Sequence, residues 1–199
     1  MSRIALPELQ AMTAEQAKAC EEAMAGPRGK VPAPMLAWLH NPELARRAQH
    51  LGALLRFQTS LGPRLSELAI LVCARHWTSH HEWTAHKKIA LEAGLDPAIV
   101  AAIASREQPV FRELAEELVY RISQELLATG RISPAHYEAG TRGLGTQGMV
   151  ELVAVLGYYC LVSLTLNAFE LGLPENAAPE LGDPAYCPPA GATGRASGA

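Results

Sequence analysis

The sequence has few aromatic residues and no long run of basic residues. Phe, Trp and Tyr make up 6% of the 199 residues, and the hydrophobic fraction of 49% comes mainly from alanine and leucine. Because alanine and leucine favour helices, whereas β-branched and aromatic residues favour strands, this bias predicts a helical chain rather than a disordered one. The formal net charge of −3, with Lys and Arg dispersed along the chain, argues against a nucleic-acid partner.

The sequence also lacks paired cysteines. It contains no C-x-x-C motif, and its four cysteines lie far apart, at Cys20, Cys73, Cys160 and Cys187. This spacing is typical of neither a zinc knuckle nor a disulfide framework. We therefore expect thiols that stay reduced, in a cytoplasmic protein.

No segment has the length and apolar character of a signal peptide or a membrane span. Residues 1–16 contain no apolar run long enough for a signal peptide. The most apolar stretch, residues 152–166, is shorter than the roughly 18 to 20 residues of a transmembrane helix. We expect no membrane partner, and we interpret residues 152–166 as a core helix, buried within the domain or at a subunit contact.

Alternating apolar and polar runs are nearly absent, whereas signals for helix ends are frequent. Gly94 and Gly130 follow helical runs and suit helix C-termini. A longer helix is expected to start near Pro109. Three capping residues precede a proline suited to the first helical position, namely Asn41-Pro42, Asp96-Pro97 and Ser133-Pro134. The predicted fold class is all-α, with roughly eight helices.

The chain is expected to form one all-helical domain over residues 1–173. Residues 174–199 are rich in Pro, Gly and Ala and are expected to lack regular structure. Within the domain, residues 67–71 resemble residues 151–155, and each copy has a serine twelve positions after its glutamate, Ser79 and Ser163. This pattern suggests an internal helical repeat.

The residues best suited to chemistry lie between Glu67 and Gly94. Four of the seven histidines fall between positions 76 and 86. Ser79, Glu82 and His86 are spaced i, i+3 and i+7, which places them on one helical face. A carboxylate four residues before an imidazole can orient the ring and raise its pKa, and a turn near Thr78 would fold Glu67 back toward this face. The pattern predicts a proton-transfer site.

Simpler interpretations of the same residues remain open. The Ser79-x-x-Glu82 pattern is also that of a capping box, and a histidine on an apolar helix is often a packed core residue. The run from His81 to His86 resembles the zinc motif H-E-x-x-H but is one residue too long. Since positions i and i+5 point about 140° apart on a helix, we expect no metal there.

Three segments together resemble the carboxymuconolactone decarboxylase family, which also contains the alkylhydroperoxidase D proteins. They are Pro63 to Leu71, Glu82-Trp83-x-x-His86, and Ala90-x-x-Ala93-Gly94-Leu95. The similarity extends over roughly residues 25–173. It implies an all-helical fold with an internal repeat and a homo-oligomer, either a trimer or a hexamer.

The peroxidase branch of this family uses a glutamate, a C-x-x-C pair and a histidine. Glu67 and His86 match the glutamate and the histidine, but Ser79 and Glu82 stand where the cysteines belong. A serine and a glutamate cannot form a disulfide, so the resemblance is closer to the decarboxylase branch. That branch removes CO2 from a carboxylated lactone without a cofactor.

The resemblance implies a role for each residue of the site. His86 would be the acid/base, Glu82 its orienting partner, and Glu67 a second carboxylate or proton relay. Substrate contacts are expected at Ser79, Trp83 and His81, the last of which replaces a tyrosine found in many relatives. Arginine forks match carboxylates, and the candidate anchors are Arg56, Arg64 and Arg75.

Two other functions stay open at this stage. The first is a peroxidase-related antioxidant activity that uses Cys73 or a partner thiol. The second is a non-enzymatic role, in which an oligomer binds a small ligand through its His and Glu cluster. The leading expectation is cofactor-independent acid/base chemistry on a small carboxylated lactone or aromatic-derived substrate.

Overall fold

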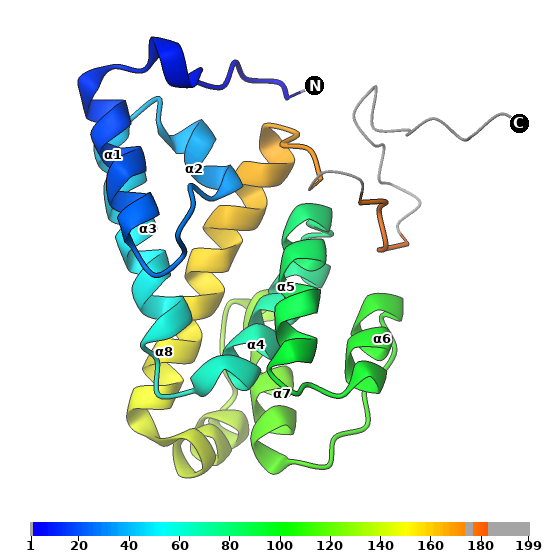
Figure 1. Ribbon diagram of the computed structural model, residues 1–199. Helices are drawn as coiled ribbons and strands as arrows, with labels where there is room; N and C mark the ends of the chain where they lie inside the picture. The colour runs from blue at the N-terminus through cyan, green and yellow to red at the C-terminus, as the bar shows by residue number, and fades with distance from the viewer. Residues whose placement is uncertain (1, 174–176, 183–199) are drawn as a thin grey trace, which may run out of the picture.

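A computed structural model describes residues 2–173 and 177–182 of the chain. Within these residues it contains helices and no strands, which confirms the all-α prediction (Figure 1). A short 3-10 helix, Leu9–Ala11, comes first, and eight α-helices follow. They are α1 (Ala14–Ala25), α2 (Ala33–Trp38), α3 (Pro42–Phe57), α4 (Gly62–His76), α5 (His80–Glu92), α6 (Pro97–Ser105), α7 (Leu114–Thr129) and α8 (Pro134–Ala168).

The three predicted capping residues begin helices α3, α6 and α8. The side chains of Asn41, Asp96 and Ser133 each accept a hydrogen bond from a backbone N–H in the first turn, and a proline follows each. The helix expected to start near Pro109 instead begins at Leu114. Residues 107–113 lie between the two helices, and the N–H of Glu107 closes the end of α6 by donating to the carbonyl of Ala102.

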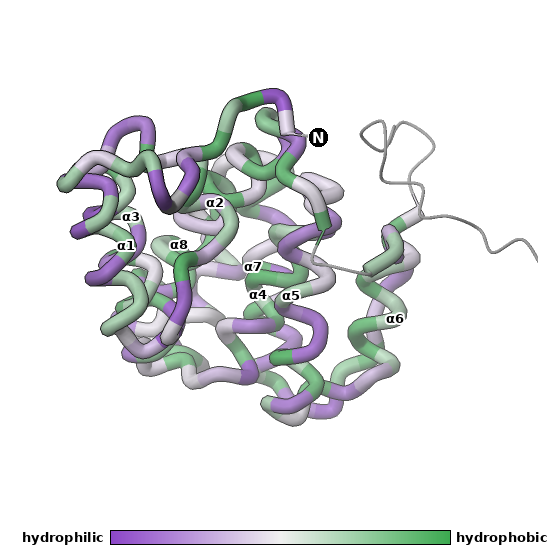
Figure 2. Tube along the Cα trace, turned by 45° about the horizontal axis from the view of Figure 1, so that its top comes forward, coloured by the Kyte–Doolittle hydropathy of each residue, from purple (hydrophilic) through white to green (hydrophobic). Residues whose placement is uncertain are grey.

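Helix α4 is the centre of the molecule. Every residue from Ser66 to Arg75 is buried, because α4 packs against α5, α7 and α8. Helices α1 to α3 form the opposite side: α1 packs on α3, α2 packs on α3 and α8, and α3 packs on both α8 and α4. In Figure 2 polar and apolar segments alternate along α1 and α3, as expected for helices with one face in solvent. A side chain on α4 therefore meets residues from distant parts of the chain.

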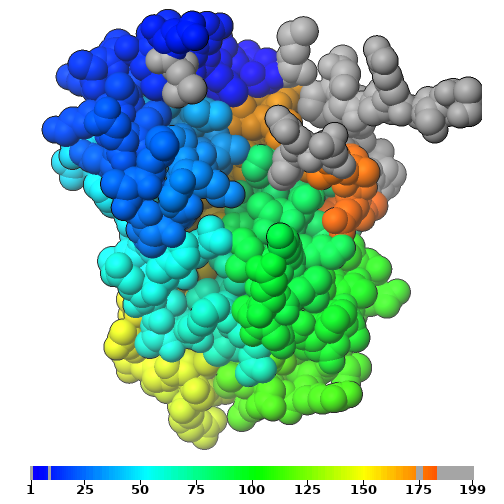
Figure 3. Space-filling model, viewed as in Figure 1, coloured from blue at the N-terminus to red at the C-terminus, as the bar shows by residue number. Residues whose placement is uncertain are grey.

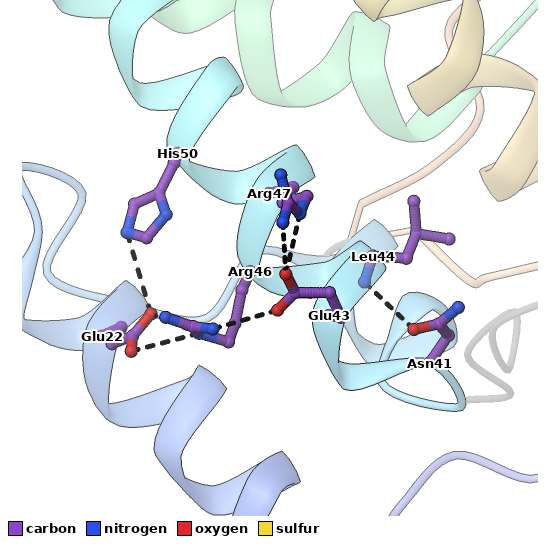
Figure 4. A network of polar contacts seen from close by, with 7 residues as sticks. All are labelled: Glu22, Asn41, Glu43, Leu44, Arg46, Arg47 and His50. Carbon is purple, nitrogen blue, oxygen red and sulfur yellow. Dashed lines mark hydrogen bonds and ion pairs between the residues drawn. The ribbon is translucent and has the colours of Figure 1, made fainter.

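Helices α1 and α3 are tied together by a network of charged side chains. The Arg46 guanidinium lies 2.9 Å from Glu22 on α1 and 3.0 Å from Glu43 on its own helix (Figure 4). Glu43 also pairs with Arg47 at 2.8 Å. These pairs lie at the surface, where ion pairs add little to stability, and the pair between Arg46 and Glu22 joins α1 to α3.

Helix α8 is the longest helix and changes direction at Gly145. The φ of 73° at Gly145 is non-helical and suits glycine. In the described part of the chain, α8 alone is long and apolar enough to cross a membrane by length and composition. Core helices pass the same test, and 56% of its most apolar window is buried against the rest of the protein. Its inner face is core, as predicted for residues 152–166, and its outer face is exposed.

Residues 177–182 lie beside α5 (Figure 3). They have no helical structure, and Glu180 pairs with Lys87 of α5. The rest of the tail predicted to be irregular, residues 174–176 and 183–199, lies outside the described residues.

The two segments of the predicted repeat differ in local structure. After Glu67, α4 ends at His76, and the chain turns through Thr78, whose φ is 47°, before α5 begins. After Glu151, α8 continues without a break through Ser163. The turn in the first copy folds α5 back onto α4, and this arrangement forms the site described next.

Candidate functional site

The turn between α4 and α5 brings Glu67 and His86 together. The left-handed backbone at Thr78 reverses the chain, and the N–H of Ser79 donates to the carbonyl of Ala74 at 2.8 Å. Since α4 and α5 then lie side by side, a residue in the second turn of α4 reaches one in the second turn of α5. The sequence left open whether Glu67 faces His86, and the structure places the two in contact.

The imidazole of His86 is held between two carboxylates. Its Nδ1 lies 2.6 Å from Oε2 of Glu67, and its Nε2 lies 3.1 Å from Oε2 of Glu82, four residues earlier on α5. All three side chains are buried, with exposed fractions of 2% for Glu67, 5% for Glu82 and 6% for His86. Nδ1 is therefore held by a hydrogen bond to Glu67, and Nε2 faces Glu82 as an ion pair.

The charges of this triad favour a protonated imidazole. Burial alone would lower the pKa of His86, but the carboxylates of Glu67 and Glu82 outweigh it and raise that pKa to about 9. Burial alone would raise the pKa of Glu82, whereas the adjacent imidazolium lowers it. At neutral pH His86 is thus a cation and Glu82 an anion, which leaves the triad with a proton to donate.

His86 and Glu82 line a cavity of about 590 Å³. Arg56 lies on its wall, and its Nε is 3.8 Å from Oε1 of Glu67. Besides His81 and His86, the charged side chains that line it are four cations and two carboxylates, namely Arg28, Lys30, Arg56, Lys88, Glu82 and Glu92. This excess of cations suits a small anionic ligand.

Two tyrosines of α8 complete the cavity wall. The ring of Tyr159 packs edge-on against His86, with 5.0 Å between the ring centroids. Tyr158 contacts Tyr159 edge-on, at 5.3 Å. Burial, and next the charge of Glu82, raise the pKa of Tyr159 well above its usual value, so its hydroxyl stays neutral. These rings supply an apolar side to a cavity that is otherwise charged.

The sequence pointed to only part of this cavity. Arg28 and Lys30 lie in a segment that belonged to the family resemblance, but no role was assigned to them. Tyr158 and Tyr159 lie within the apolar stretch that was interpreted as core. The sequence could not predict that these tyrosines lie near His86, because they are far from it in the chain and only the packing of α8 against α5 brings them to the site.

The other predicted contacts on α5 have different positions. His81 lines the cavity, and its Nδ1 lies 2.6 Å from the carbonyl oxygen of Gly172. Trp83 is 1% exposed and packs in the core, and it is not among the described residues that line the cavity. Ser79 holds the N-cap position of α5, but its buried hydroxyl makes no capping hydrogen bond, so it is not the simple cap that its spacing suggested.

Two of the three candidate arginine anchors lie away from this cavity. The Arg75 guanidinium donates a hydrogen bond to the carbonyl of Ala104 at 2.8 Å and another to the carbonyl of Gly182 at 2.9 Å. It lines a separate cavity and joins α4 to the segment after α8. Arg64 pairs with Glu116 at 3.3 Å. Of the three, only Arg56 is placed to meet a ligand beside His86.

Metal ligands were not expected in this chain, and the described residues contain no group of three or more His, Cys, Asp or Glu side chains arranged to hold a metal ion. His81 and His86, which resembled part of a zinc motif, have different partners: the carbonyl of Gly172 for His81, and two carboxylates for His86.

Comparison with known proteins gives matches in structure alone. No protein-family model matches the sequence, and no curated protein does. A solved structure from Ralstonia eutropha JMP134, described as an alkylhydroperoxidase AhpD core and an uncharacterized peroxidase-related protein, superposes with a TM-score of 0.72 at 17% identity. The match covers 87% of this chain and 93% of that one.

A second solved structure gives the same result. It is an uncharacterized peroxidase-related protein from Silicibacter sp. TM1040, with a TM-score of 0.71, 16% identity, and coverage of 87% of this chain and 92% of that one. At sequence identities this low, the structural likeness shows the fold alone. The chain therefore has an all-helical fold of the alkylhydroperoxidase AhpD core type.

Proposed function

We propose that this chain is an enzyme that performs acid/base chemistry on a small carboxylated substrate. The observation that carries the proposal is the position of His86, a buried imidazole between Glu67 and Glu82 at the wall of a cavity rich in cations. A protonated group with a fixed partner on each side is suited to deliver a proton to a reacting carbon or oxygen.

Proton transfer in this site runs along the triad. Nδ1 of His86 is hydrogen bonded to Glu67, and Nε2 lies 3.1 Å from Oε2 of Glu82, so the proton that the ring gives up is the one on Nε2, and Glu82 is the group placed to receive it. Glu82 then carries the proton to the substrate, while Glu67 holds the other side of the ring. This differs from the expectation that His86 meets the substrate directly and that Glu82 only orients it.

The cations of the cavity would bind the substrate carboxylates. Arg56 and Arg28 present planar guanidinium groups, which match a carboxylate with two parallel hydrogen bonds. With a carboxylated lactone, the bond from the ring to one carboxylate breaks and CO2 leaves. The electron pair moves into the conjugated lactone carbonyl, and the relay returns a proton to the resulting dienolate. No step in this sequence requires a cofactor.

A homo-oligomer, trimeric or hexameric, remains part of the proposal. Its support is the exposed apolar face of α8, where four large side chains are 42–66% exposed, namely Val150, Val153, Leu161 and Leu164. Helix α3 carries a similar exposed set, Leu44, Leu51, Leu54 and Phe57. Exposed apolar patches of this kind often mark contacts between subunits. The location that suits free thiols is the cytoplasm.

The test is a turnover assay on 4-carboxymuconolactone and a panel of related carboxylated lactones. Release of CO2 by the wild type, and its loss in Glu82→Gln and His86→Ala variants that stay folded, would support the proposal. Binding of a panel member without turnover would favour the ligand-binding alternative. Turnover unchanged in both variants would refute the role of the triad.

A peroxidase-related activity is the second candidate. Both similar structures carry that description, and it fits the shared fold at least as well as a decarboxylase does. The His86 site holds no thiol, because Ser79 and Glu82 occupy the positions of the C-x-x-C pair. Any thiol chemistry has to use cysteines elsewhere in the chain. Consumption of hydrogen peroxide that is lost in a Cys73→Ser variant would favour this candidate.

A further inference from the structure

Two cysteines that are 87 positions apart in the sequence lie in contact. The Sγ atoms of Cys73 on α4 and Cys160 on α8 are 3.7 Å apart. The sequence gave no reason to pair them, because the pairing depends on how α8 packs along α4. Two sulfurs at this distance need only a small side-chain movement to form a bond of about 2 Å.

The two thiols have different surroundings. Cys73 is fully buried, whereas Cys160 is partly exposed. The indole Nε1–H of Trp77 donates a hydrogen bond to Sγ of Cys160, at 3.2 Å. Cys160 is thus the less buried of the two cysteines, and its sulfur accepts a hydrogen bond that stabilises a thiolate. Cys73 lies directly behind it.

The acidities agree with this geometry. The hydrogen bond with Cys73 lowers the pKa of Cys160 to about 6. Burial of Cys160 opposes this shift, and the hydrogen bond from Trp77 adds to it. The hydrogen bond to Cys160 and burial raise the pKa of Cys73. The lowered pKa of Cys160 and the raised pKa of Cys73 favour a thiolate at Cys160 and a thiol at Cys73, the combination that a nucleophilic cysteine and its resolving partner require.

We propose that Cys73 and Cys160 form a redox-reversible pair, which a hydroperoxide oxidises to a disulfide between α4 and α8 and which an external dithiol reduces. The Cys160 thiolate attacks the hydroperoxide, the O–O bond breaks, and the products are a Cys160 sulfenic acid and an alkoxide or hydroxide that takes up a proton. The Cys73 thiol then attacks that sulfur, an S–S bond forms, and water leaves. A dithiol returns both cysteines to thiols and becomes a disulfide itself.

This site is separate from the acid/base function and does not rest on it. It would supply the thiol chemistry that the second candidate function needs, from residues other than a C-x-x-C pair. It also lies on the helices that build the His86 site, since Cys73 follows Glu67 on α4 and Cys160 adjoins Tyr159 on α8.

The test is mapping of disulfides by mass spectrometry in the full chain before and after treatment with hydrogen peroxide. The wild type, which has four cysteines, is expected to lose two thiols, to yield a peptide that links Cys73 to Cys160, and to recover both thiols with dithiothreitol. A Cys20→Ser, Cys187→Ser double variant is the control, and it is expected to form the same link.

Single variants separate the two roles. Cys73→Ala is expected to accumulate a sulfenic acid at Cys160 that dimedone traps, and Cys160→Ser is expected to leave Cys73 unreacted. Folding of each variant is checked by circular dichroism. The peptide map of the wild type tests the proposal even if a variant fails to fold. Loss of thiols without a Cys73–Cys160 peptide, or oxidation confined to Cys20 and Cys187, would overturn the proposal and leave the acid/base function untouched.

Discussion

Nδ1 of His86 lies 2.6 Å from Oε2 of Glu67, although the two residues are 19 positions apart and on different helices. The contact is buried, and Glu82 occupies the other side of the ring. Two buried carboxylates would repel each other if the ring between them were neutral. A positive charge on His86 is therefore what makes this arrangement stable.

The first prediction is a loss of stability as the pH rises above neutral. The pKa of His86 is about 9 in the folded protein and about 6.5 in an unfolded chain. Because the folded value is raised, the contribution is fully present below pH 6.5 and is lost as the pH rises through 9. The free energy of unfolding should fall by about 3 kcal/mol over this window, as measured by urea denaturation.

Two variants identify His86 as the source of that pH dependence. Glu67→Gln removes one of the carboxylates and should shrink the change between pH 6.5 and 9. His50→Gln replaces a histidine whose side chain is 59% exposed and should leave the change as it is in the wild type. Equal pH dependence in the wild type and Glu67→Gln would show that the triad does not hold the proton.

The second prediction concerns Glu82 in catalysis. Glu82→Gln keeps the size of the side chain but cannot accept a proton from His86. On any substrate that the wild type turns over, kcat should fall by about 100-fold or more, the usual size of a general acid/base contribution. Glu138→Gln, at an exposed position of α8, is the matched control and should keep full activity. A kcat within twofold of the wild type in Glu82→Gln would contradict the relay.

The third prediction is selective binding of small carboxylates. Arg56→Gln should weaken the binding of a dicarboxylate by about tenfold or more, because a charged hydrogen bond contributes about 1.5–3 kcal/mol. Arg64→Gln removes a guanidinium that pairs with Glu116 outside this cavity, and it should leave the affinity unchanged. Isothermal titration calorimetry measures both, and equal losses in the two variants would point to a general charge effect.

The fourth prediction tests the close approach of α3 to the cavity wall. A Cβ at Gly52 would lie 2.1 Å from the hydroxyl of Tyr158 and 2.8 Å from Nη2 of Arg28. Gly52→Ala should therefore displace both side chains and destabilise the protein by about 1–3 kcal/mol in thermal or urea unfolding. Gly157→Ala, where a Cβ would meet no atom within 4 Å, should not destabilise the chain. A neutral Gly52→Ala would show that this contact is loose.

The fifth prediction concerns Trp77 and the reactivity of Cys160. Trp77→Phe keeps an aromatic ring but removes the N–H that donates to the Cys160 sulfur. The pKa of Cys160 should rise from about 6, so alkylation by iodoacetamide at pH 6.5 should slow severalfold. Cys20, whose pKa is raised by burial, serves as the reference thiol in the same sample. An unchanged alkylation rate would show that Trp77 does not tune the thiol.

The sequence predicted the features that depend on neighbouring residues. Asn41, Asp96 and Ser133 cap helices as expected, because a cap involves only the next few residues. Glu82 and His86 share a helical face for the same reason. The contact of Glu67 with His86 was a conditional expectation, since it required the turn that Thr78 provides.

Other features depend on packing between distant segments, and the sequence did not predict them. Arg28 reaches the cavity from the loop before α2 and Tyr159 from α8, and Cys73 meets Cys160 only where α8 crosses α4. Arg75 looked equivalent to Arg56 in the sequence. It differs because the carbonyls of Ala104 and Gly182 surround its guanidinium, a contact that no local pattern encodes.

The measurement that tests the central claim most directly is a ¹⁵N NMR titration of the His86 imidazole in the full chain. If His86 is the proton donor of a relay, both ring nitrogens are protonated at pH 7, and the ring titrates near pH 9. A neutral ring at pH 7, with a pKa at or below 6.5, would contradict the account, because the triad would then have no proton to deliver.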